Sequence, residues 1–433
     1  MKKELVVSVV GAGLAGCSAA FELARMGIRV NLFEMRPALM TEAHKTGKPA
    51  ELVCSNSLKS KELSRASGLL KTELEMLDCE MLKIAYENSI PGGKALVVDR
   101  EGFADAVDMK LKSNPLVTSI VEEITDFSLE KQFPVIYATG PLTSEKLLKA
   151  FQERFSSALF FYDAIAPSVL LDSLDTKEMF WGSRNQEDCH DYLNIPLSKE
   201  EYLKLYSDLL EADTIAEKPF EKKYFEICLP VEELARRGVD TLRFGPLKPV
   251  GFNLPRKPYA VIQLRREDKA GKIMGMVGFQ TRLSYKSQKK VFSGIRGFEN
   301  AEFIRLGSLH KNSYLNSPDF LDDHLRLKTG QNVWFAGQIA GSEGYTEAIA
   351  LGLAAGKFAG RRLLGNEIPS FPDKTIIGSL IKYITEGQSP IKPMQANWGL
   401  LEEMNMKDKK KKYEKYANES ICSLKEYINM YFR

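Results

Sequence analysis

A strand, a glycine-rich turn, a helix and a second strand ending in an acid follow one another at residues 5–34. Residues 5–10 are β-branched and apolar and stop at a glycine, which is typical of a buried parallel strand. Gly11, Gly13 and Gly16 then form a GxGxxG pattern at the start of a helix expected over residues 14–26. We therefore predict an α/β fold that begins with a Rossmann-like dinucleotide-binding unit.

Each part of this pattern has a role in holding a dinucleotide. Gly11 allows a sharp turn, Gly13 lets a pyrophosphate approach the backbone, and Gly16 lets the helix pack closely on the strand. Glu34 ends the second strand 18 residues beyond Gly16, where a carboxylate can accept hydrogen bonds from ribose hydroxyls. A chance glycine turn would lack this surrounding order of elements.

Two later segments favour FAD over NAD as the tightly held cofactor. "PVIYATGP" at residues 134–141 predicts a strand that ends in a glycine turn, and residues 332–364 predict a strand, a glycine loop and a helix of small residues. The start of that helix offers free N–H groups and a positive dipole end, which suit the negative charge of a reduced flavin. This order is typical of FAD proteins of the glutathione-reductase type. A second complete GxGxxG is absent, so we expect NAD(P)H to bind only transiently. The residues expected to bind the cofactor are Gly11, Gly13, Leu14, Ala15, Gly16, Glu34, Arg36, Gly140, Gly337, Gln338, Gly344 and Tyr345.

The middle of the chain differs in character and predicts a separate unit. Ser198 with Glu201 three residues later resembles a helix capping box, and residues 258–268 and 273–292 are interpreted as strands separated by charged turns. We expect a discontinuous FAD-binding domain from residues 1–165 and 296–433, interrupted by an α+β insertion domain at 166–295. Basic and aromatic residues alternate in this insertion, which indicates either a solvated surface or an RNA-binding face.

Composition limits the alternatives. A formal net charge of only +3 means that any RNA contact must rest on a local patch. No apolar run is long enough to predict a transmembrane helix. The six cysteines lack a CxxC pair, which argues against a disulfide framework or a zinc site, so no metal is expected and a reducing cytoplasm is the natural setting.

Two cysteines lie in unusual surroundings. Cys54 lies in "AELVCSNSLKS" among small polar residues, and Cys228 precedes Pro230 and a predicted helix. A free cysteine is usually a small buried apolar residue. A thiolate is the alternative where cations or a helix start lie close by.

Long blocks of the chain resemble the TrmFO family, the methylenetetrahydrofolate- and FAD-dependent tRNA (uracil-5-)-methyltransferases. The similarity runs nearly end to end, through "GAGLAG", "AELVCSNSLKS", "ATGPLTSE", "YFEICLPVEELARRG", "TLRFGPLKPVG" and "GQIAGSEGYTEAIALGLAAG". Ile227, Lys311 and Ser313 depart from the expected family pattern, which favours Gly, Arg and Thr at these positions.

The resemblance implies a reaction and a set of site residues. NAD(P)H would reduce FAD, a methylene group would pass from 5,10-methylenetetrahydrofolate by way of the flavin to uracil C5, and hydride return would give 5-methyluridine in the T-loop of tRNA. Cys54 and Cys228 would be the catalytic thiols, one bonding the methylene-bearing flavin and the other acting as base or nucleophile toward uracil. The residues expected to bind the folate or RNA substrate are Asn56, Arg282, Lys286, His310 and Asn312.

Three alternatives remain open from the sequence. The same chemistry on ribosomal RNA would leave every motif unchanged. A GidA-like FAD protein that modifies the wobble uridine of tRNA would share the first motif, although such proteins carry a long C-terminal helical domain. A flavin-stabilised RNA-binding protein without catalysis would make both cysteines dispensable.

Overall fold

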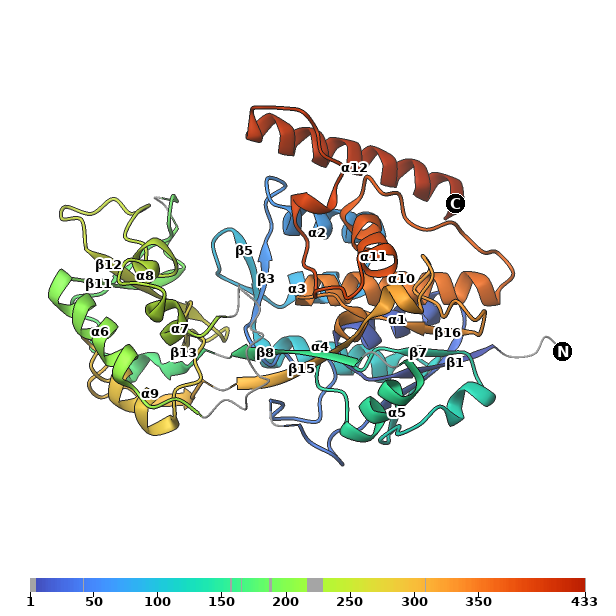
Figure 1. Ribbon diagram of the computed structural model, residues 1–433, viewed down its shortest axis with the longest axis horizontal. Coiled ribbons are helices and arrows are strands. Elements are labelled where there is room, and N and C mark those ends of the chain that lie inside the picture. The colour runs from blue at the N-terminus through green and yellow to red at the C-terminus, as the bar shows by residue number, and fades with distance from the viewer. Residues whose placement is uncertain are drawn as a thin grey trace.

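The structure is a computed structural model that describes residues 5–41, 43–155, 158–164, 166–186, 189–215, 229–307 and 309–432. Two lobes are evident in Figure 1, a larger one that holds both ends of the chain and a smaller one built from its middle. Each lobe has its own cluster of buried apolar side chains. The predicted α/β class with an additional α+β unit is confirmed.

A five-stranded parallel sheet forms the centre of the larger lobe. Its strand order is β16–β7–β1–β2–β6, and every neighbouring pair is parallel. All its strands therefore end at one edge, where the connecting loops gather. The strands are β1 (Val6–Val10), β2 (Arg29–Glu34), β6 (Val117–Val121), β7 (Val135–Tyr137) and β16 (Val333–Phe335).

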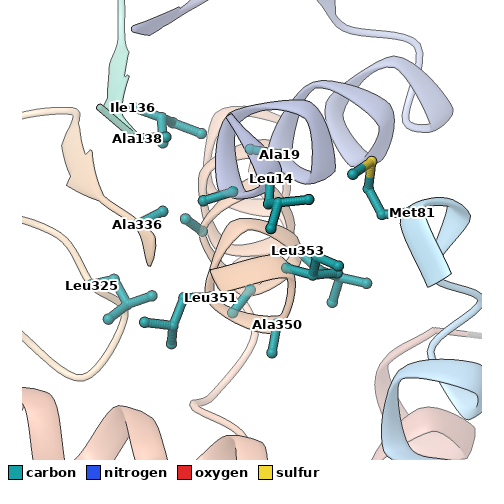
Figure 2. Packing of buried hydrophobic residues seen from close by; sticks show 14 of the residues in the cluster. Leu14, Ala19, Met81, Ile136, Ala138, Leu325, Ala336, Ala350, Leu351 and Leu353 are labelled. Carbon is teal, nitrogen blue, oxygen red and sulfur yellow. The ribbon is translucent and has the colours of Figure 1, made fainter. Parts of the chain in front are cut away.

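Two helices rich in small residues cross closely on this sheet. A side chain added at Gly352 of α10 (Tyr345–Leu363) would place its Cβ 2.1 Å from the carbonyl oxygen of Ala15 in α1 (Leu14–Arg25). Figure 2 shows the two helices crossing, with Leu14 of α1 and Leu353 of α10 in one apolar cluster. Only glycine allows the helices to approach to this distance.

The remaining elements of the larger lobe surround this centre. Glu73 of α2 is fully buried and accepts hydrogen bonds from the N–H groups of Ile376 and Ile377 at 2.7 and 2.9 Å. It also accepts from Ser420 Oγ at 2.6 Å. Glu73 therefore fixes both α11 and α12 on α2. A small sheet has the order β3–β5–β4. The elements are β3 (Ser57–Ser60), α2 (Ala66–Met76), α3 (Glu80–Glu87), β4 (Ser89–Ile90), β5 (Ala95–Val98), α4 (Arg100–Ser113), α5 (Glu145–Phe155), α11 (Ile376–Glu386) and α12 (Lys409–Tyr431).

The smaller lobe is a six-stranded sheet with helices packed against it. Its strand order is β10–β11–β12–β13–β9–β14, with antiparallel neighbours throughout. The predicted capping box is confirmed at the start of α6, where Ser198 and Glu201 bond reciprocally. The elements are β9 (Ser168–Leu170), β10 (Phe180–Trp181), β11 (Tyr192–Leu197), α6 (Lys199–Glu211), α7 (Val231–Arg236), α8 (Thr241–Phe244), β12 (Ala260–Arg266), β13 (Ile273–Met276), α9 (Tyr285–Phe292) and β14 (Phe303–Arg305).

One predicted strand is wrong over its second half. Residues 285–292 form helix α9 instead of continuing β13, and the Ser284 side chain caps it by accepting from the Ser287 N–H. Val291 and Phe292 then enter the core of the smaller lobe from the last turn. The cap and the helical spacing of these buried residues outweigh the local strand tendency.

Two long strands connect the lobes. β8 (Ala158–Ala164) leads out and β15 (Leu309–Leu315) leads back, and they pair antiparallel along their whole length (Figure 1). β14 belongs to the sheet of the smaller lobe although it lies beyond the expected boundary at residue 296. Among the described residues, no helix is both long and apolar enough to cross a membrane.

The helix crossing yields a stability prediction. Alanine normally stabilises a helix relative to glycine by about 1 kcal/mol. At Gly352 we expect the opposite, because the new Cβ would meet backbone rather than a flexible side chain. Gly352→Ala should lower the free energy of unfolding by about 1–3 kcal/mol in chemical denaturation.

Gly182→Ala is the matched control for this variant. Its nearest neighbour would be a Phe180 ring carbon at an ordinary 3.6 Å. We expect its stability to stay within about 0.5 kcal/mol of the parent. Equal stabilities for Gly352→Ala and the parent would contradict the close crossing.

Candidate functional site

A cleft opens where the loops of the parallel sheet meet the start of α10. Most of the predicted cofactor residues line it, from the first motif to the late glycine loop. These lining residues are Gly11, Gly13, Leu14, Ala15, Glu34, Arg36, Gly140, Gln338, Gly344 and Tyr345. The other two lie directly behind the wall, since a Cβ on Gly16 would be 1.8 Å from the Gly11 carbonyl oxygen and one on Gly337 would be 2.6 Å from Ala15 Cβ.

The first glycine turn leaves a gap that suits a pyrophosphate. Gly11 has a φ of +99°, and a Cβ there would come within 2.6 Å of the Ala138 carbonyl oxygen. Gly13 is different, because a Cβ there would meet nothing within 4 Å. Gly13 also begins α1, and no side chain caps that helix end. The first N–H groups of α1 therefore face open space, as phosphate binding requires.

Glu34 presents a charged carboxylate to the same cleft. It accepts hydrogen bonds from the Ala12 N–H at 2.9 Å and from Arg36 Nε at 2.8 Å. Burial alone would raise the pKa of the Glu34 carboxyl, but the hydrogen bond and the charge of Arg36 outweigh it and keep that pKa below its usual range. An ionised carboxylate in this place can accept hydrogen bonds from ribose hydroxyls.

The first turn of α10 holds the loop that carries Cys54. The Tyr345 hydroxyl accepts hydrogen bonds from the N–H groups of Cys54 at 2.9 Å and Ser55 at 3.2 Å. Thr346 Oγ1 donates to the Leu58 carbonyl at 3.1 Å. The next residue, Glu347, accepts from Lys59 Nζ at 2.9 Å. Burial, and then the nearby Cys54, raises the pKa of the Tyr345 phenol, so the phenol remains neutral.

Of the two predicted catalytic cysteines, the structure describes only Cys54. Cys54 is half-buried and lines the cleft. Cys228 lies outside the described residues, and the chain is described again from Leu229, just before α7. Gln280, whose carbonyl accepts the N–H of Val231 in α7, lines the cleft from the smaller lobe.

The predicted substrate residues are divided between the cleft and other places. Asn312 is buried and lines the cleft, and His310 lies two residues earlier in β15. Lys286 is exposed on α9 and does not line the cleft. Arg282 is buried, also outside the lining, and forms an ion pair with Glu233.

Asn56 is bonded between the lobes rather than directed at the cleft. Its side chain is fully buried and donates to the carbonyls of Val98 at 2.9 Å and Arg266 at 3.1 Å. Its Oδ1 accepts from Arg265 Nε at 3.1 Å. The amide group of Asn56 is therefore fully engaged by protein atoms, and it links the segment after Cys54 to strand β12.

Several lining residues were not anticipated from the sequence. They come from the loop that carries Cys54, from β3, from the turn after β7, from the segment before α10 and from the C-terminal segment. Polar residues close to Cys54 were a usable signal for the first of these groups, whereas nothing near Gln395 in the sequence indicates its position. The residues are His44, Glu51, Ser55, Lys59, Thr139, Leu142, Glu343 and Gln395.

Comparison with known proteins identifies the family. The family model described as glucose inhibited division protein A matches residues 6–367. The methylenetetrahydrofolate–tRNA-(uracil-5-)-methyltransferase TrmFO of Caldicellulosiruptor bescii is 47% identical over 98% of this chain and 99% of its own length. The protein of the same name from Bacillus subtilis is 47% identical over 96% of this chain and 97% of its own length. The chain belongs to the TrmFO family.

A solved structure has a similar fold, although its sequence identity to this chain is much lower than that of the TrmFO proteins. GidA from Aquifex aeolicus superposes with a TM-score of 0.69 over 98% of this chain and 74% of the GidA chain, at 16% identity. This similarity concerns the fold alone. The higher identity to the TrmFO proteins over their whole length separates this chain from the GidA-like alternative.

The residues present fit an FAD. The open gap over Gly13, the ionised Glu34 and the uncapped N-terminus of α10 at Gly344 provide for pyrophosphate, ribose and an anionic ring respectively. FAD is thus the cofactor that this cleft accommodates, as the sequence predicted.

This geometry predicts a variant that separates FAD binding from folding. A Cβ at Gly13 meets no protein atom, so Gly13→Ala should fold with a stability within about 0.5 kcal/mol of the parent. The same Cβ enters the space of the pyrophosphate, so we expect FAD affinity to fall at least about tenfold. Titration of flavin-free protein by calorimetry measures this directly.

Gly16→Ala provides the contrast, because its Cβ would overlap the Gly11 carbonyl and must disturb the fold itself. Unchanged FAD affinity in Gly13→Ala would refute this placement of the pyrophosphate.

Proposed function

We propose that this protein methylates C5 of a uracil in tRNA, using FAD and 5,10-methylenetetrahydrofolate, with NAD(P)H as the reductant. One observation carries the proposal: Cys54 lines the FAD cleft and is fixed there by the first turn of α10. The chain is 45–48% identical over nearly its full length to proteins named as folate-dependent tRNA uracil-5-methyltransferases. The cleft has one dinucleotide-binding turn, so NAD(P)H would bind transiently.

The bound flavin supplies the two-electron chemistry that carries a one-carbon unit from folate to uracil. Cys54 provides a nucleophilic sulfur at the cleft wall. The Tyr345 hydroxyl accepts from the N–H groups of Cys54 and Ser55, one on each side of the Cys54 Cα, so the thiol keeps a defined position during the reaction. Asn312 is the proposed hydrogen-bond partner of a pterin or uracil, since it lines the cleft. Cys228 and His310 keep the roles inferred from the family resemblance, with Cys228 as base or nucleophile toward uracil.

Entry of the target base requires a change in the RNA. A uridine within a folded T-loop is stacked and must flip out of the stack to reach a cleft wall. Exposed cations near the opening would hold the flanking phosphates. Arg282 is engaged by Glu233, so we assign this role to Lys286 and its neighbours Lys289 and Lys290 on the exposed side of α9.

The decisive experiment is a methylation assay with purified protein, FAD, NADPH and methylenetetrahydrofolate. Unmodified tRNA and unmodified ribosomal RNA are offered separately, and 5-methyluridine is measured by nucleoside mass spectrometry. We expect product on tRNA. Product on ribosomal RNA alone would keep the chemistry and replace the substrate, while a flavin-loaded, reducible protein that yields no product would refute the proposal.

Removal of the cleft thiol should abolish methylation. Cys54→Ala is expected to lower the rate of 5-methyluridine formation at least about 10³-fold, because the described lining of the cleft contains no other thiol. Cys422→Ala is the matched control, since Cys422 is exposed on α12 and does not line the cleft. Near-normal turnover in Cys54→Ala would assign the cysteine a structural role.

The lysines of α9 should determine affinity rather than chemistry. A variant with Lys286, Lys289 and Lys290 changed to Ala is expected to bind tRNA more weakly, and the slope of log K against log salt should fall by about 2–3. Lys409, Lys410 and Lys411, exposed on α12, provide a triple-alanine control of equal charge. Equal salt slopes in the two variants would remove α9 from the RNA-binding face.

A further inference from the structure

The carbonyls of the two residues before Cys54 are held by two arginines. The Arg100 guanidinium donates to the Leu52 carbonyl, and Arg305 Nη1 donates to the Val53 carbonyl at 3.4 Å. Both arginines also share one carboxylate, since Arg100 Nη2 and Arg305 Nη2 each lie 3.3 Å from Glu267 Oε1. The backbone leading into Cys54 therefore rests on an arginine–glutamate–arginine network.

This network joins the two lobes. Arg100 begins α4 in the larger lobe, whereas Glu267 follows β12 in the smaller lobe and is 8% exposed. Arg305 ends β14, from which the chain returns to the larger lobe through β15. Ser168, at the start of β9, completes the contact by donating to Glu267 Oε2 at 2.8 Å and accepting from Arg305 Nη2 at 3.1 Å.

The network has a net positive charge. Two guanidiniums share one carboxylate, and Arg305 keeps a buried Nε without a hydrogen-bond partner among the described residues. Burial, and then the nearby Arg100, lowers the pKa of Arg305, so the charge is held there at a cost in stability. Partial burial and then Arg305 and Arg100 also lower the pKa of Lys45. An unfavourable cluster of cations beside a nucleophile is a feature of functional sites.

The charges around Cys54 come from every element packed on its loop. Arg305 interacts electrostatically with Cys54 itself, and Arg100 with the neighbouring Tyr345 phenol. The groups are Arg100 on α4, Arg305 on β14, Glu267 after β12, His44, Lys45 and Glu51 on the preceding loop, Lys59 on β3, and Tyr345 and Glu347 on α10.

We propose that Arg305, together with Arg100, is a positioning residue for Cys54, which fixes the carbonyls before the thiol and keeps positive charge beside it so that the thiolate is favoured. Cation proximity is a principal means by which proteins make a cysteine reactive. The inference deepens the proposed function, since it concerns the thiol assigned there, but its test requires neither RNA nor folate.

The test measures the pH dependence of Cys54 alkylation in the FAD-loaded, full-length protein. Iodoacetamide labelling of the Cys54 peptide is followed by mass spectrometry over the range of thiol ionisation, and the exposed Cys422 provides an internal standard. For Arg305→Gln we expect the midpoint to rise by about 0.5–1 pH unit, because a neighbouring cation is lost. Arg305→Lys keeps the charge and should stay within about 0.3 unit of the parent.

Arg326→Gln is the matched control. The Arg326 side chain is 17% exposed, against 15% for Arg305, and pairs with Asp322 outside the cleft lining. It should leave the Cys54 midpoint unchanged. If Arg305→Gln does not fold, as judged by thermal unfolding and flavin absorbance, Arg100→Gln serves in its place with the same expected rise.

Two results would overturn the proposal. One is an unchanged midpoint in the glutamine variant, and the other is an equal rise in Arg305→Lys, which would make the charge irrelevant. A failed methylation assay combined with the expected alkylation shift would instead refute the proposed function and leave this inference standing.

Discussion

The close crossing of α1 and α10 is the contact on which the site depends. Gly352 lies against the Ala15 backbone, and Gly337 brings the preceding loop against the same residue. This approach places the uncapped N-termini of both helices, at Gly13 and Gly344, on one cleft. Two positive helix ends from distant parts of the chain thereby face the same ligand, one suited to a pyrophosphate and one to an anionic ring.

The same helix then determines where the reactive cysteine lies. Tyr345, Thr346 and Glu347 are consecutive in α10, and their side chains bond in turn to the segment that runs from Cys54 into β3. Cys54 and Ser55 precede β3, and the two hydrogen bonds to the Tyr345 hydroxyl help to fix this irregular part. A displacement of α10 would therefore change the flavin pocket and the position of the thiol together.

Local patterns explain what could be predicted from the sequence. The GxGxxG turn, Glu34 and the capping box at Ser198 each depend on residues close together in the chain, and their structures were anticipated. Residues 285–292 were assigned wrongly because the Ser284 cap and the packing of Phe292 against distant side chains outweigh strand tendency.

Side-chain partners far along the chain could not be predicted in the same way. Asn56 is a polar residue close to Cys54 and was therefore expected to bind substrate. Its hydrogen-bond partners, Arg265 and Arg266, lie about two hundred positions later in the chain. Arg282 was expected to be available for an anion, but it forms an ion pair with Glu233 of α7. Sequence alone indicated which residue types gather near the cleft, whereas the direction of each side chain depends on tertiary contacts.

The loop at Cys54 has two supports of different chemistry. Tyr345 accepts from the Cys54 N–H group, and burial keeps that phenol neutral. Arg100 and Arg305 donate to the carbonyls of the two preceding residues. The phenol fixes the position of the loop, whereas the guanidinium groups also place positive charge near the thiol. Because Arg305 and Glu267 belong to the smaller lobe, which also carries the lysines of α9, the charge beside the thiol depends on how the two lobes are joined.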